Sequence, residues 1–161
     1  MKLLILGAGG HGKVCGEIAR KSYEEIAFLD DNAPGVIGRM EDYEKLKGYE
    51  SAFVALGNPE LREEWIEKLI ASGYQIATIV SEKAVVSKLA TIGEGSVVMG
   101  GAVVQTGAEI GSGCIVSAGA VVDHDAKVGS FCHINCNAVI PAMKIVADKL
   151  KVNYGQIYVE E

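Results

Sequence analysis

The sequence of 161 residues has few aromatic side chains, only three prolines and no long apolar run. No apolar segment reaches the ~18 residues of a membrane-spanning helix, so no membrane span is expected. The apolar start, Met1 to Leu6, is too short for a signal peptide, and we expect a cytoplasmic protein with reduced cysteines. A net charge of −6 without a basic block makes nucleic acid an unsuitable partner.

Charged residues are concentrated in the first half of the chain. Residues 1–79 hold 22 of the 36 charged side chains (15 basic and 21 acidic), whereas residues 80–140 hold eight. Of the 18 valines, 15 lie at or after Val80. This change in composition predicts two domains, residues 1–79 and residues 80–161.

Residues 1–79 alternate short apolar runs with segments of helical spacing. The predicted strands are Leu3–Leu6, Ile26–Leu29, Ala52–Leu56 and Gln75–Val80, each too short for a helix. One helix is predicted over His11–Ser22. A second begins at Pro59, with Asn58 as its N-cap, and ends at Gly73. Its predicted apolar face is Trp65, Ile66, Leu69 and Ile70. This alternation predicts an α/β domain with a parallel sheet.

Residues 80–152 repeat with a period of six. The anchor positions, which are all Val or Ile, are Val80, Val86, Ile92, Val98, Val104, Ile110, Val116, Val122, Val128, Ile134, Ile140, Val146 and Val152. A small residue stands two positions before each anchor from Val86 to Ile140. A hexapeptide repeat predicts an all-β parallel β-helix with inward-pointing anchors. Gly93, Gly111 and Gly129 are predicted to take positive φ in its turns.

The repeat loses its regular composition after Pro141. Lys144 and Leu150 stand where earlier hexads have small residues, and the turn glycines disappear. We therefore expect an atypical C-terminal cap from about residue 141, with a closing strand over Tyr154–Val159 because a solenoid needs a cap.

A glycine-rich loop follows the first predicted strand. Gly7-Ala8-Gly9-Gly10-His11-Gly12 matches G-x-G-x-x-G, in which backbone N–H groups approach a phosphate at a helix N-terminus. Asp30 and Asp31 follow Gly12 by 18 and 19 residues, the spacing of a ribose-binding acid. The motif alone favours a nicotinamide cofactor, although about 80 residues provide only one mononucleotide half. A tight turn without a ligand is the other interpretation.

A histidine lies between two acids in Asp123-His124-Asp125, two residues past an anchor and hence near a coil corner. Imidazole removes protons efficiently near neutral pH, and a neighbouring carboxylate fixes its tautomer. A solvated turn histidine is the alternative. Cys132, His133 and Cys136 lack the spacing of a structural zinc site, so no metal is predicted.

With these motifs taken together, residues 80–140 resemble the left-handed β-helix of hexapeptide-repeat acyltransferases. Residues 2–79, through the glycine loop and Phe28-Leu29-Asp30-Asp31, resemble the small Rossmann-like domain that precedes it in one subgroup. This subgroup contains the sialic acid O-acetyltransferases and the N-acetyltransferases of nucleotide-linked 4-amino sugars. The resemblance implies a homotrimer that uses acetyl-CoA as co-substrate.

The resemblance also implies roles for individual residues. The nucleotide-sugar site, expected to take a UDP-sugar, comprises Gly9, Gly10, His11, Asp30, Asp31 and Gly57. His124 is the general base, Asp125 orients it, and His133 contacts acetyl-CoA. The function expected is acetyl transfer to an amino or hydroxyl group of the sugar. A nucleotide-sugar-binding or scaffold protein without donor binding is the alternative, and an NAD-binding protein is a third.

Overall fold

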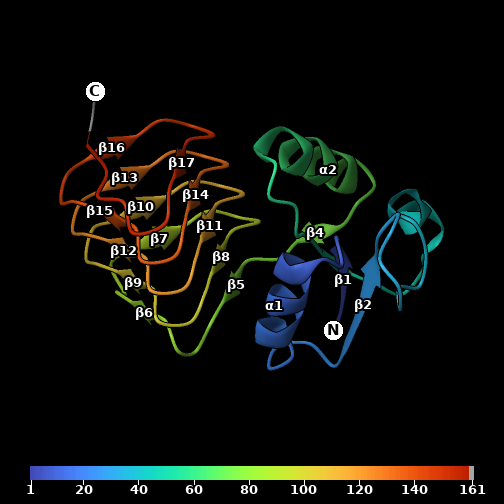
Figure 1. The fold of residues 1–161 in the computed structure, drawn as a ribbon. Helices are drawn as coiled ribbons and strands as arrows, with labels where there is room; N and C mark the ends of the chain where they lie inside the picture. The colour runs from blue at the N-terminus through green and yellow to red at the C-terminus, as the bar shows by residue number, and fades with distance from the viewer. Residues whose placement is uncertain (160–161) are drawn as a thin grey trace. The chain divides into compact units, whose positions relative to one another are not determined.

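The computed structural model of the protein describes residues 1–159 and divides the chain into two units (Figure 1). The boundary lies between Ala77 and Thr78. Within the described residues, no helix combines the length and the apolar composition that crossing a membrane requires.

The first unit is a parallel sheet with helices in its connections. Its elements are β1 (Lys2–Leu6), α1 (Gly10–Ala19), β2 (Glu25–Leu29), the 3₁₀ helix η1 (Met40–Lys45), β3 (Ser51–Val54), α2 (Pro59–Ala71) and β4 (Gln75–Ile76). The strand order is β2-β1-β3-β4. The side chains of Leu3 to Leu6 are completely buried, as expected for a central parallel strand. The predicted α/β fold is confirmed.

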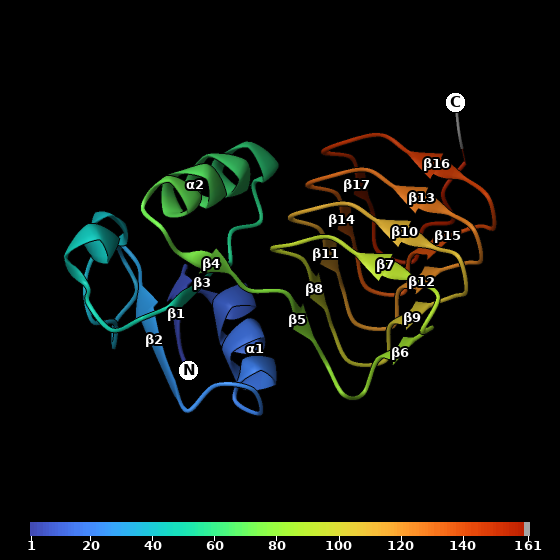
Figure 2. The same ribbon diagram turned by 180° about the vertical axis from the view of Figure 1, so that it is seen from behind.

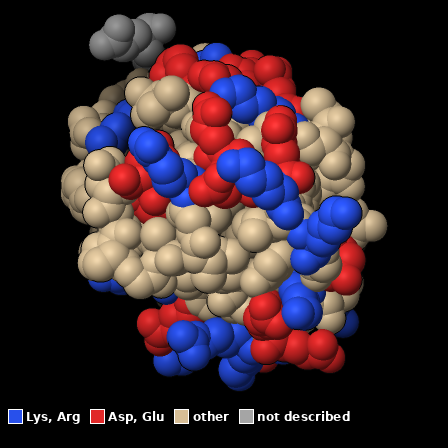
Figure 3. All heavy atoms as spheres, turned by 90° about the vertical axis from the view of Figure 1, so that its right-hand side faces the viewer, with Lys and Arg blue, Asp and Glu red and all other residues tan. Residues whose placement is uncertain are grey.

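Two local predictions for this unit need correction. The single strand predicted over Gln75–Val80 is two short strands, because β4 ends at Ile76 and β5 (Ile79–Val80) pairs with β8 (Val97–Val98) of the second unit. Helix α1 ends at Ala19 rather than Ser22. The N-cap prediction holds: the Asn58 side chain accepts a hydrogen bond from the backbone N–H of Leu61 at 2.8 Å. On the face shown in Figure 3, acidic and basic side chains lie beside one another.

The second unit is a β-helix built from three parallel sheets (Figure 2). After β5, its strands are β6 (Val85–Val86), β7 (Thr91–Ile92), β8 (Val97–Val98), β9 (Val103–Val104), β10 (Glu109–Ile110), β11 (Ile115–Val116), β12 (Val121–Val122), β13 (Lys127–Val128), β14 (His133–Ile134), β15 (Val139–Ile140), β16 (Ile145–Val146) and β17 (Lys151–Val152). We name each sheet by its first strand. The β5 sheet is β17-β14-β11-β8-β5, the β6 sheet β15-β12-β9-β6 and the β7 sheet β16-β13-β10-β7. Every third strand pairs, so one coil takes three hexads.

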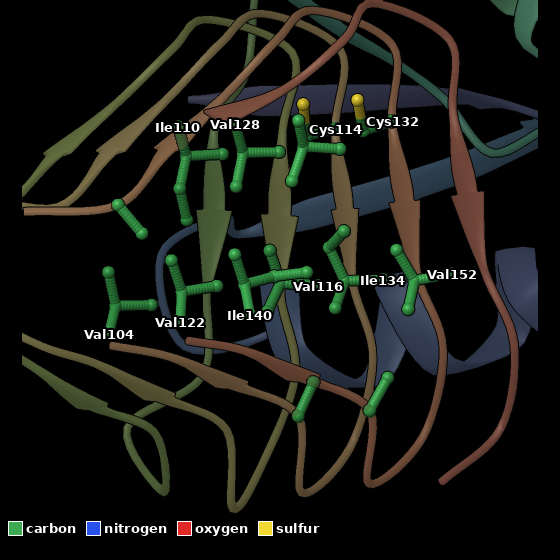
Figure 4. Close-up of a cluster of buried hydrophobic side chains, with 14 of the residues drawn as sticks. Val104, Ile110, Cys114, Val116, Val122, Val128, Cys132, Ile134, Ile140 and Val152 are labelled. Atoms are coloured by element: carbon green, nitrogen blue, oxygen red, sulfur yellow. The ribbon is translucent and has the colours of Figure 1, made fainter. Parts of the chain in front are cut away.

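The anchor residues form the core of this unit (Figure 4). Those from Val98 to Val152 are buried, and the small residues from Ala102 to Ala138 are fully buried between them. The anchors of the first coil are less buried than the others, since Val80 is 41% exposed. Val86 and Ile92 are only half-buried. These residues have no preceding coil to stack against.

The turn glycines have a different role from the one predicted. Positive φ recurs every sixth residue, at Gly95, Gly101, Gly107, Gly113, Gly119, Asp125, Phe131, Asn137, Met143, Lys149 and Gly155. Gly93, Gly111 and Gly129 do not belong to this set. A Cβ on Gly93 would lie 2.5 Å from the carbonyl carbon of Gly111 in the next coil. These three glycines are therefore required by the close stacking of coils.

The last hexads that the structure describes keep the register of the repeat. Tyr158 stands six residues after Val152, is buried against the core and donates its hydroxyl to the Ile145 carbonyl at 3.1 Å. The closing strand expected over Tyr154–Val159 is reduced to one bridge between Val139 and Ile157. Lys144 and Leu150, which stand where earlier hexads have small residues, are half-buried.

Candidate functional site

The glycine loop of the first unit lies at the carboxyl end of β1. Gly7 has a φ of +102°, and a Cβ on Gly12 would overlap the Gly7 carbonyl oxygen, so both positions require glycine. Gly9 and Gly10 are exposed, and a Cβ on either would meet no atom within 4 Å. No side chain caps the N-terminus of α1 at Gly9. The first amides of α1 are thus available to an anion, which the helix dipole favours.

Asp30 at the end of β2 fixes this loop. Its Oδ2 accepts the Ala8 N–H at 2.8 Å, and its Oδ1 accepts the N–H groups of Asn32 and Ala33 at 2.8 and 2.9 Å. These three hydrogen bonds hold the pKa of the Asp30 carboxyl below its ordinary value. Asp31 is more open: its Oδ1 accepts the Met40 N–H at 3.2 Å. The two predicted ribose acids therefore have different surroundings.

His11, in the first turn of α1, is half-buried. Burial, followed by the charge of Arg62, lowers its pKa to about 4, so the ring is neutral near pH 7. Its ring nitrogens lie 3.8 Å from the Cys15 Sγ, which the fold buries completely. A neutral imidazole offers one donor and one acceptor to a ligand.

Arg62 is a residue that the sequence reasoning missed. Its side chain is 1% exposed, and Nη1 donates to the carbonyls of Leu56 at 2.7 Å and Gly57 at 3.1 Å. It thereby holds the strand-end loop that carries the predicted Gly57. The signal was its helical spacing, because Arg62, Ile66 and Leu69 form the buried face of α2. Ile70, which was predicted on that face, is 53% exposed.

His124 and Asp125 of the second unit are in contact at the corner between β12 and β13. His124 Nδ1 lies 2.9 Å from Asp125 Oδ2, and the His124 backbone N–H donates to Asp123 Oδ1 at 2.7 Å. A carboxylate only accepts, so Nδ1 carries the proton and Nε2 keeps a free lone pair. The side chains are 48% and 61% exposed, so a substrate can reach them.

The electrostatics of this pair suit a base. The hydrogen bond that His124 donates to Asp125 is the main cause that raises the pKa of His124 above 6.5, with further contributions from the charges of Asp123 and Asp125. Such a pair stabilises the imidazolium that forms when a proton is taken from a substrate.

His133 lies elsewhere on the β-helix. It belongs to β14 of the β5 sheet, where its Nε2 is 3.1 Å from the hydroxyl of buried Ser117. His124 follows the β6 sheet and precedes the β7 sheet. The chain therefore brings His124 and Asp125 together and places His133 on another sheet. Among the residues that the structure describes, no group of three or more His, Cys, Asp or Glu could hold a metal ion.

Comparisons with known proteins agree with both units. Residues 2–69 match the family model described as the PglD N-terminal domain, and residues 90–124 match the bacterial transferase hexapeptide model. UDP-N-acetylbacillosamine N-acetyltransferase of Bacillus subtilis is 35% identical over 107 residues, which are 59% of this chain and 50% of that protein. The match thus spans half the length of this curated relative.

Two solved structures extend the similarity to nearly the whole chain. The acetyltransferase domain of PglB from Neisseria gonorrhoeae, in complex with acetyl coenzyme A, is 34% identical with a TM-score of 0.88 over 98% of this chain and 90% of that one. A perosamine N-acetyltransferase variant from Caulobacter crescentus, in complex with CoA and GDP-perosamine, is 29% identical with a TM-score of 0.83 over 94% of this chain and 73% of that one. The β-helix is of the left-handed type, as predicted. The chain belongs to the hexapeptide-repeat sugar acetyltransferase family, in the group with a PglD-type N-terminal domain.

Proposed function

We propose that the protein transfers the acetyl group of acetyl-CoA to an amino or hydroxyl group of a nucleotide-activated sugar. The observation that carries this proposal is the exposed His124–Asp125 pair, with a free Nε2 on His124. The acceptor attacks the thioester carbonyl, the C–S bond breaks, and His124 takes the proton of the acceptor. His124 then returns this proton to the departing sulfur, so CoA leaves as the thiol. The relatives whose structures hold acetyl-CoA, or CoA with GDP-perosamine, support this substrate pair.

The exposed glycine loop is the proposed binding site of the nucleotide. The amides of Gly9 and Gly10 at the N-terminus of α1 face the diphosphate, and neutral His11 adds a hydrogen bond. Asp30 positions the loop, since its oxygens already accept three backbone N–H groups. Asp31 and the exposed Gly57 then remain for the nucleoside.

We propose a homotrimer with the active site between neighbouring copies. His124 and His133 lie on different sides of one β-helix, so a site with His133 at the acetyl-CoA thioester needs a second copy of the chain. The outward residues of the β6 sheet support such packing: they form the paired series Val85, Val103, Val121 and Val139. Apolar faces of this kind mark protein interfaces.

Both proposed substrates are charged compounds of metabolism, which fits a cytoplasmic enzyme.

The test is an acetyl-transfer assay with acetyl-CoA and UDP- and GDP-linked 4-amino sugars, with release of the CoA thiol as the readout. His124→Ala serves as the control variant. Thermal shifts with acetyl-CoA, UDP and NAD are measured in parallel, because a ligand raises the melting temperature of the state that binds it. A shift with UDP but neither a shift nor transfer with acetyl-CoA would support the scaffold alternative. A shift with NAD alone would support the dinucleotide interpretation.

A further inference from the structure

We infer that Gly107 is a positioning residue for the base, because its missing side chain makes the space that the Asp125 carboxylate occupies. This inference rests on the proposed role of His124. Gly107 lies 18 residues before Asp125, at the same corner of the preceding coil. A Cβ built on Gly107 would overlap Asp125 Oδ1 and lie 3.2 Å from its Cγ.

The backbone of Asp125 leaves its carboxylate little choice of position. Its φ is +58°, a left-handed conformation that aspartate tolerates better than most side chains. Its N–H donates to the Thr106 carbonyl at 3.0 Å, which fixes the turn against the preceding coil. With the backbone of Asp125 fixed in this way, its Oδ1 lies over Gly107 and its Oδ2 accepts the hydrogen bond from His124 Nδ1. A Cβ at residue 107 would therefore rotate the carboxylate away from the imidazole.

The same corner in the other coils carries little charge that could replace Asp125. The preceding coil has Gln105 and Thr106 beside Gly107, and the following coil has Pro141, Ala142 and Met143, none of which titrates. The charged residues that flank these corner segments along the chain are Glu109, Asp123, Lys127 and Lys144, and Lys127 pairs with Glu109 at 3.2 Å. Of these only Asp123 joins Asp125 in acting on His124.

Gly101 provides a matched control in the same β-helix. It occupies the equivalent turn position with a φ of +75°, against +70° for Gly107. The nearest atom to a Cβ at Gly101 is the Gly119 backbone nitrogen at 3.6 Å, an ordinary contact. Gly101→Ala therefore introduces the same backbone strain as Gly107→Ala without touching a side chain of the candidate site.

The experiment measures the pKa of His124 by NMR titration of the imidazole resonances. The chain has three histidines, and loss of one signal in His124→Ala assigns it. We expect Gly107→Ala to lower the pKa of His124 toward the value found in Asp125→Asn, and Gly101→Ala to leave it at the wild-type value. In the Asp125→Asn background, Gly107→Ala should cause no further shift, because the two changes act through one hydrogen bond.

A second variant guards against misfolding. Gly107→Asn adds the same Cβ with a residue that the fold accepts at this turn, since Asn137 adopts a φ of +57°. An unchanged pKa of His124 in folded Gly107→Ala and Gly107→Asn would overturn the inference, as would an equal shift in the Asp125→Asn background. The titration needs no activity, so it decides this inference even if His124→Ala retains full acetyl transfer and the proposed function fails.

Discussion

The two units hold their candidate functional loops by different means. In the first unit each loop is held by hydrogen bonds to one side chain that has no repeated counterpart. Asp30 holds the glycine loop, and buried Arg62 holds the strand-end loop of Gly57. In the β-helix every corner has counterparts in neighbouring coils, and the candidate base stands where Asp125 replaces the turn glycine of earlier coils. The repeat therefore contains its own reference positions, such as Gly101 for Gly107, whereas the first unit has none.

This difference predicts that chemistry and nucleotide binding separate between the units. His124→Ala removes the base and should lower kcat by about 10²–10⁴, the usual contribution of one positioned base. The affinity for UDP should stay unchanged, because the proposed phosphate contacts belong to Gly9 and Gly10. Steady-state kinetics and UDP titration calorimetry measure the two effects. A parallel loss of UDP affinity would contradict the separation.

The pH dependence of the rate tests the role of His124 as the base. The pKa of His124 is raised, so the free base forms only as the pH rises above a value higher than 6.5. The rate should increase through that apparent pKa in the wild type. In Asp125→Asn the midpoint should move to lower pH while the maximal rate falls, since the ring loses its orienting partner. An unmoved midpoint would argue against His124 as the titrating group.

Coil stacking gives the largest expected effect on stability. Gly111→Ala places a Cβ 2.7 Å from the Gly129 carbonyl carbon and the Ser130 nitrogen, both backbone atoms of the next coil. Such overpacking should cost about 3 kcal/mol of unfolding free energy. Gly101→Ala, whose Cβ makes only ordinary contacts, should cost about 1 kcal/mol from its positive φ alone. Urea unfolding followed by far-UV circular dichroism compares them, and equal losses would contradict the stacking argument.

The glycines show how far sequence reasoning reaches in the β-helix. The six-residue period was sufficient to identify the anchors, because the face that a residue occupies determines its burial wherever coils stack on both sides of it. It failed to assign the glycines correctly, since positive φ and close approach of coils both favour glycine. The two kinds of glycine differ only in their position within the hexad. Positive φ falls at the position of Gly107, whereas Gly93, Gly111 and Gly129 occupy a different one.

The first unit should be sensitive to acid because of His11. Its pKa of about 4 lies below the ordinary 6.5, so the unfolded chain binds more protons in this interval. Unfolding free energy should therefore fall as the pH decreases below 6.5, by about 2 kcal/mol at pH 5. Trp65 on α2 is the only tryptophan, so its fluorescence reports the first unit.

A histidine-free variant of that site is the control for this prediction. In His11→Gln the unfolding free energy of the first unit should be flat between pH 7.5 and pH 5, because residues 1–77 then contain no histidine. The carboxylates whose pKa values are lowered, such as Asp30, lose their contribution only below this window. An acid loss that persists in His11→Gln would assign it to other groups.

Sequence reasoning predicted fewer of the residue roles in the first unit, for a physical reason. The motif placed Gly9, Gly10, His11 and Asp30 at one sheet edge, because the strand ends of a parallel sheet meet there. It gave no means of distinguishing the roles of Asp30 and Asp31, which depend on where neighbouring N–H groups point. Arg62 was missed because a charged residue is expected in solvent, and here two strand-end carbonyls compensate its burial.

Surface ion pairs should give the smallest difference between the units. In α2, Lys68 lies 2.8 Å from Glu64 and 4.3 Å above the Trp65 ring, so the cation has two partners. In the β-helix, Lys127 meets Glu109 across strands at 3.2 Å, with both side chains more than half exposed. Double-mutant cycles should give about 0.5–1 kcal/mol for the first pair and at most about 0.5 kcal/mol for the second. Salt should weaken both, and because Lys68 retains its ring contact, Glu64→Gln should lose less stability than Lys68→Met. A coupling in the β-helix pair larger than that in α2 would mean that cross-strand geometry outweighs the aromatic contact.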